Sequence, residues 1–166
     1  YFALRNYKHE TIFHVAAKNN ARDSLKFLVG RSVFIQELLR KDYKGDTAIH
    51  AAAKAGAVEM LQYLCQHATP GFLEMQNDFQ MTAEAAAKEK AHLYSQVLVD
   101  KELGAADRDK YTAKLARVKQ CAEVLAKFDD WLTEMRWNAT FDEPLELFLE
   151  QRADANMRIF MGMARP

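Results

Sequence analysis

The sequence is poor in residues that cross-link or interrupt a chain: its 166 residues include two cysteines, three prolines and six glycines. Two cysteines cannot form a disulfide framework, and the separation of Cys65 and Cys121 by 56 positions matches no metal-ligand spacing. We therefore expect no metal, and we expect a reducing, intracellular setting, the cytoplasm.

The chain also lacks an excess of charge and a long hydrophobic run. It has 23 Lys and Arg against 23 Asp and Glu, so it has no overall basic field with which to attract a nucleic acid. Its apolar runs are far shorter than the roughly 20 residues of a membrane span, and no signal segment opens it. With 49% hydrophobic residues it can still bury a core. Since the sequence begins at Tyr1 rather than Met, we expect a piece of a longer protein.

What the chain does contain is a repeat. Thr11, Thr47 and Thr82 lie 36 and 35 residues apart, and the alanine-rich runs IFHVAAKNN, AIHAAAKAG and AEAAAKEKA follow them. A second apolar segment follows each run, at 24–30, 58–65 and 93–99. This period is typical of a solenoid, and the pattern predicts units of turn, helix, turn and helix. The apolar segments at 30–41 and 71–75 are expected to fill gaps between units.

The units resemble the ankyrin repeat, whose signature is D-x-x-G-x-T-P-L-H-x-A-A-x-x-G. The second unit matches it at Asp42, Gly45, Thr47, Ile49, His50, Ala52, Ala53 and Gly56. The first unit departs at Asn6, His9 and Asn20, and the third at Glu84, Ala85 and Ala91. The resemblance implies an all-α, ankyrin-type α-solenoid: an ankyrin-repeat domain over 1–104, with units at about 6–41, 42–76 and 77–104.

Two residue types of the signature have a structural explanation. A threonine at a helix start can cap free backbone N–H groups, and a histidine three residues later can bond to a neighbouring turn. His14 and His50 are therefore interpreted as structural, because the sequence offers no second histidine or carboxylate at chelating spacing.

Residues 105–166 are predicted to form a helical extension that caps the solenoid or begins a further domain. The stretch 107–137 contains no glycine or proline and reads as one long helix with two apolar stripes. One stripe is expected to meet the last repeat, and the other a final helix at about 143–161, with Pro144 in its first turn. The alternative is a partner-binding helix hairpin whose adaptable surface consists of Met135, Met157, Met161 and Met163.

No catalytic signature is present. Phosphate-loop, dinucleotide, zinc-protease and serine-hydrolase motifs are missing, and Cys65 with nearby His67 on one helix does not make a nucleophile and base. We expect no enzyme activity and no cofactor in these residues.

The resemblance implies a protein-binding module, because ankyrin repeats grip partners with hairpin tips and the concave face of the first helices. By register, Tyr7 over Tyr43 and Lys8 over Lys44 form columns at the tips, and Lys18 over Lys54 forms one on the concave face. Such a surface suits a partner with acidic and apolar groups. The full set of predicted partner-binding residues is Tyr7, Lys8, Glu10, Lys18, Asn19, Tyr43, Lys44, Asp46, Lys54, Phe79 and Met81.

Several roles remain open for such a module. The basic columns also fit a merely solvated face. The parent protein would be an intracellular scaffold or a bacterial effector delivered into host cytoplasm. The alternatives are a spacer that orders other domains, or the accessory part of an enzyme whose active site lies elsewhere.

Overall fold

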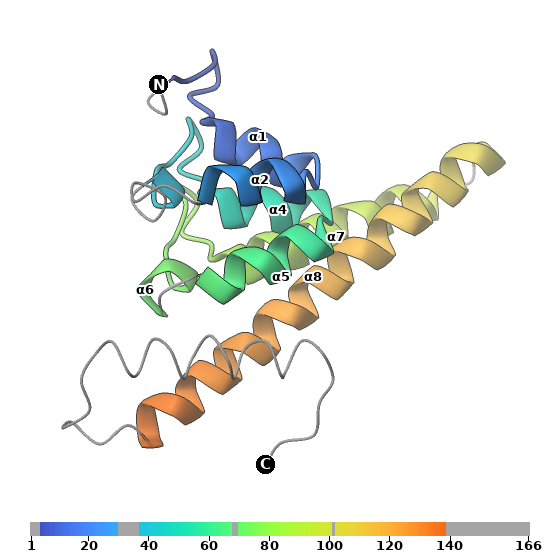
Figure 1. Ribbon diagram of the computed structural model, residues 1–166. Helices are drawn as coiled ribbons and strands as arrows, with labels where there is room; N and C mark the ends of the chain where they lie inside the picture. The colour runs from blue at the N-terminus through green and yellow to red at the C-terminus, as the bar shows by residue number, and fades with distance from the viewer. Residues whose placement is uncertain (1–3, 30–36, 68–69, 101, 139–166) are drawn as a thin grey trace.

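The structure is a computed structural model that describes residues 4–29, 37–67, 70–100 and 102–138. Every regular element in these ranges is a helix, and the helices stack side by side above one long helix (Figure 1). The predicted all-α solenoid is therefore confirmed. The final helix predicted at 143–161 and the methionines at 157, 161 and 163 lie outside the described residues, as do the side chains of Trp131 and Met135.

The first two units are helix pairs of similar build. Unit 1 contains α1 (Ile12–Lys18) and α2 (Arg22–Val29), and unit 2 contains α4 (Ala48–Ala55) and α5 (Val58–His67). Asn20 and Gly56 separate the two helices of each unit, with left-handed φ angles of 53° and 71°. Glycine and asparagine tolerate that conformation, so each first helix ends where the signature residue stands.

The third unit differs from the prediction. In place of two helices broken near residue 92, a single helix, α7, runs from Ala83 to Val99. The physical reason is Ala91, which occupies the position of Asn20 and Gly56. Alanine is the strongest helix former and avoids the left-handed region, so nothing ends the helix there.

The predicted long C-terminal helix is confirmed as α8 (Ala105–Asn138). It turns back along α7 and crosses beneath α5, so it takes the place that a second helix of unit 3 would occupy (Figure 1). Residues of both predicted stripes are buried, namely Val118, Cys121, Ala122, Leu125 and Phe128.

The core lies between the first and second helices of the units. Phe13 and Ile49 are the large side chains that α1 and α4 bury, and Leu61 and Leu64 meet them from α5. Between neighbouring first helices the buried residues are small, as Ala17, Ala52, Ala53 and Ala87 are, so the backbones can approach closely. The short helix α6 (Pro70–Leu73) buries Phe72 and Leu73, which confirms that this segment fills a gap.

Candidate functional site

The same turn is built three times at the tips of the units. The side-chain oxygens of Asn6, Asp42 and Asn77 each accept two backbone N–H bonds, from residues two and four positions later, at 2.8 to 3.1 Å. Side chains of this kind fix turns because they replace a backbone acceptor. His9, Gly45 and Gln80 close these turns in the left-handed conformation, so the three tips share one shape.

Backbone hydrogen bonds join the tips into a row. The N–H of Tyr43 donates to the carbonyl of Lys8, and the N–H of Asp78 donates to the carbonyl of Lys44, both at 3.1 Å. Gly45 is required at this junction, because a Cβ there would lie 2.6 Å from the nitrogen of Asp78. The tips are therefore held in a fixed order and spacing.

This row presents aromatic side chains to solvent. Tyr7 is 86% exposed, Tyr43 is 52% exposed and Phe79 is 62% exposed. The ammonium nitrogen of Lys8 lies 5.3 Å from the centre of the Tyr7 ring, and that of Lys44 lies 5.4 Å from the centre of the Tyr43 ring. We call these five residues the tip surface. The structure brings together here the aromatic and basic columns that the repeat register predicts.

The predicted concave residues lie in a different setting. The Lys18 ammonium is paired with Glu10, and the Lys54 ammonium donates to both carboxylate oxygens of Asp46 at 2.7 and 2.8 Å. Glu10 and Asp46 are buried. Asn77 of the next unit also donates to Asp46, at 2.9 Å. These four charges are engaged within the protein and neutralise one another.

These ion pairs could have been predicted from the repeat, because their two residues recur at fixed positions in units 1 and 2. An acid just before the threonine and a lysine seven residues after it occur together in units 1 and 2. In unit 3 both are replaced, by Met81 and Glu89.

The remaining predicted residues are Asn19 and Met81. The exposed Asn19 side chain donates to the carbonyl of Val15 at 2.9 Å. The carbonyl of Met81 accepts hydrogen bonds from the backbone N–H of Asn77 and from Nε2 of His50. Neither side chain extends the tip surface as the aromatic rings do.

The two signature histidines tie one unit to the next. Nδ1 of His14 accepts the N–H of Thr11 at 3.2 Å, so the ring proton is on Nε2, which donates to the carbonyl of Asp46 at 2.8 Å. His50 makes the equivalent contacts with Thr47 and Met81. Burial lowers the pKa of both histidines, and the backbone bond offsets part of that effect.

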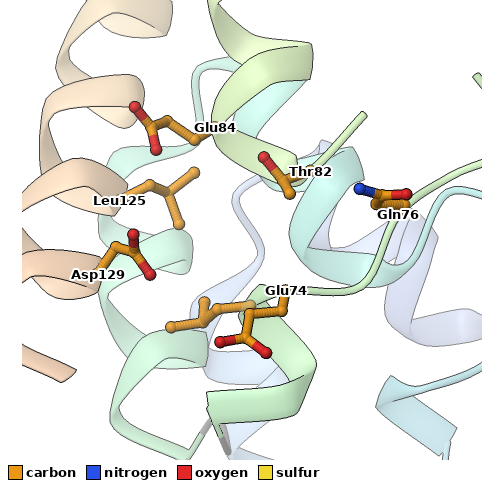
Figure 2. A pocket seen from close by; sticks show the side chains of 7 residues that line it. Glu74, Gln76, Thr82, Glu84, Leu125 and Asp129 are labelled. Carbon is orange, nitrogen blue, oxygen red and sulfur yellow. The ribbon is translucent and has the colours of Figure 1, made fainter. Parts of the chain in front are cut away.

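A pocket of about 350 Å³ lies next to the third tip, between α6, the start of α7 and α8. Figure 2 shows Leu125 between the carboxylates of Glu84 and Asp129, with Glu74 across from them. Sequence reasoning missed this pocket, because its acids come from three elements that only the folded chain brings together. Among the described residues that line the pocket, none is a cation that could bind an anionic substrate.

The cysteines are equally poor candidates for chemistry. Cys65 is fully buried, and burial raises the pKa of Cys121 to about 12. Reactive cysteines need a lowered pKa and access to solvent. In the described part of the chain, no three His, Cys, Asp or Glu residues are grouped so that they could hold a metal ion.

Comparison with known proteins shows what the repeats are similar to. A family model described as "Ankyrin repeats (3 copies)" matches residues 3–73. No curated protein matches the chain. None of the described helices combines the length and the apolar character needed to span a bilayer. Ankyrin repeats are in general non-catalytic and mediate protein–protein interaction. Residues 3–73 of this chain are therefore similar to ankyrin repeats.

Proposed function

We propose that this chain is a non-catalytic module that binds a partner protein through its tip surface. The observation that carries the proposal is the row of exposed aromatic rings at Tyr7, Tyr43 and Phe79 on three tips of one rigid shape. Large exposed rings at fixed spacing supply contact area with little loss of side-chain entropy on binding.

The chemistry of the row suits an extended segment with alternating acidic and apolar groups. Lys8 and Lys44 place a cation beside each tyrosine ring, at 5.3 and 5.4 Å. A carboxylate of the partner can pair with the ammonium while an adjacent apolar side chain packs on the ring. Lys18 and Lys54 contribute less, because buried carboxylates already neutralise them.

The wider setting is part of the same proposal. We place the module in the cytoplasm, as part of a scaffold or of an effector that acts in a host cell. Residues 105–166 are proposed to serve as its helical cap, since α8 packs against α4, α5 and α7.

The test is an affinity pull-down from a host-cell lysate with the whole chain as bait. The variant combines Tyr7→Ala, Tyr43→Ala and Phe79→Ala. The matched control combines Leu93→Ala with Val99→Ala, which removes exposed apolar side chains far from the tips. We expect proteins that the parent and the control retain and that the triple variant loses.

The contribution of a single ring to the binding affinity can be measured with the variant Tyr43→Ala. An aromatic residue at the centre of an interface typically accounts for about 2 kcal/mol, so affinity should fall roughly 30-fold. The melting temperature should hardly change, because the ring is half exposed. Equal capture by the triple variant and the parent would contradict the proposal, and a large fall in stability of Tyr43→Ala would make Tyr43 a packing residue instead.

A further inference from the structure

One end of the helix stack presents an apolar face. At 100° per residue, Ile12 and Val15 lie on the side of α1 opposite to His14 and Ala17. His14 reaches unit 2 by its bond to the carbonyl of Asp46. Ile12 and Val15 therefore point away from unit 2, toward the position that an earlier unit would occupy.

The chain itself shows what covers this face elsewhere. The residues equivalent to Ile12 and Val15 are Ala48 and Ala51 in unit 2 and Ala83 and Ala86 in unit 3, and all four are buried. They are covered because α1 packs on α4 and α4 packs on α7. In unit 1 the same positions carry larger apolar side chains, and these are 48% and 41% exposed.

The second helix of unit 1 also exposes an apolar side chain whose equivalent in unit 2 is buried. Phe27 of α2 is 77% exposed, whereas its equivalent Tyr63 in α5 is 9% exposed. Part of the cover over Tyr63 comes from the preceding unit, whose Arg22 lies 5.8 Å above the ring. We call Ile12, Val15 and Phe27 the open face.

Backbone polar groups beside the open face are equivalent to groups that form hydrogen bonds between neighbouring units elsewhere in the stack. In unit 2 the N–H of Tyr43 donates to Lys8, and the carbonyl of Asp46 accepts Nε2 of the preceding histidine. Their equivalents in unit 1 are the N–H of Tyr7 and the carbonyl of Glu10. Within the described ranges, neither group makes the corresponding bond to another unit.

The opposite end of the stack is built differently. Ala85 of α7 stands where units 1 and 2 have the bridging histidine, and it is exposed. Lys88 stands where they have a buried alanine, and it forms an ion pair with Glu84. The missing histidine and the charged Lys88 oppose further stacking, so the stack is closed at unit 3 and open at unit 1.

We propose that the open face is the docking surface for one further ankyrin-type helix pair, joined in sequence to the N-terminal side of α1. The direction follows from the interfaces present: the unit that covers α4 ends immediately before Asp42, so one that covers α1 in the same way ends immediately before Asn6. This surface is separate from the tip surface and does not depend on it.

The test adds such a unit to the whole chain. A copy of residues 42–76 is inserted between Arg5 and Asn6, which keeps the register because Asn77 and Asn6 are equivalent. We expect one cooperative unfolding transition and a melting temperature raised by about 5 °C or more, since neighbouring units stabilise each other. Hydrogen exchange in α1 should slow in the same protein.

Variants separate docking from a general effect of the insertion. Ile12→Glu with Val15→Glu should abolish the gain in the extended protein, yet leave the melting temperature of the unextended chain nearly unchanged. The control Phe79→Glu, at an exposed apolar site outside the open face, should keep the gain.

Three outcomes would overturn the proposal. One is a separate melting transition for the inserted unit or no gain in melting temperature. Another is an equal gain in the Ile12→Glu, Val15→Glu variant. The third is a concentration-dependent dimer of the unextended chain that this variant dissolves, which would make a second copy the natural occupant.

Discussion

Replacing Gly56 with alanine tests how the C-terminal helix joins the repeats. Gly56 ends α4 with a φ of +71°, and a Cβ at this position would lie 2.8 Å from the Cβ of Arg117 in α8. The substitution therefore strains the backbone and pushes α8 away from the repeats at the same point.

The expected cost follows from these two effects. A left-handed alanine costs about 1 kcal/mol, and overpacking of a tight contact costs about 1–3 kcal/mol. Ordinary van der Waals contact begins near 3.4 Å, so α8 has to move by about 0.6 Å, which loosens the packing of Val118 and Cys121. A loss of about 3 kcal/mol lowers the melting temperature of a chain of this size by roughly 6–12 °C.

Thermal unfolding followed by circular dichroism measures this shift, and hydrogen exchange shows whether α8 loses protection. The matched control is Gly71→Ala, because no atom lies within 4 Å of a Cβ at this position and the residue is helical. It should be neutral or slightly stabilising. If Gly56→Ala melted within about 2 °C of the parent, the placement of α8 against Gly56 would be refuted.

Two further predictions concern the contacts between units. Asp46→Ala should cost about 3 kcal/mol in urea unfolding, because it strips Lys54 and the buried Asn77 of an acceptor they share. Stability should fall as the pH drops from 7 through 6.5 to 5.5, because the folded-state pKa of His14 and of His50 lies below the ordinary 6.5 and the unfolded chain then binds more protons. The slope is at most about 1.4 kcal/mol per pH unit for each histidine.

A specific result would contradict each of these two predictions. Asp46→Asn keeps an acceptor for Asn77 and should cost less than Asp46→Ala; equal costs would show that the shared acceptor is unimportant. A urea midpoint that stayed constant between pH 7 and 5.5 would mean that the two histidines are not held neutral.

The sequence specified the repeats well because their geometry depends on local residue types. Thr11, Thr47 and Thr82 each start a helix, and Asn20 and Gly56 end the first helices of two units. The continuous α7 was also encoded locally, since Ala91 replaces a residue that tolerates a left-handed φ. The prediction of two helices was wrong because the apolar segment 93–99 resembles its counterparts in units 1 and 2, whereas a break before it depends on the one residue at position 91.

The candidate site was harder to predict, because burial decides which charges are available. Lys18 and Lys54 appear free in the sequence, yet the folded chain pairs them with acids eight residues earlier. The aromatic tips were predictable because Tyr7 and Tyr43 occupy the same position of the repeat. The contact of Gly56 with Arg117 joins residues 61 positions apart, and no local pattern announces it.

Site-specific photo-crosslinking tests most directly the claim that the tip surface binds a protein. A benzophenone amino acid replaces Tyr43 in the whole chain, and Leu93 on the exposed side of α7 in a control, and each protein is irradiated in host cells. We expect a discrete covalent adduct with another protein at position 43 and none at position 93. An adduct at position 93 alone, or none at position 43, would contradict it.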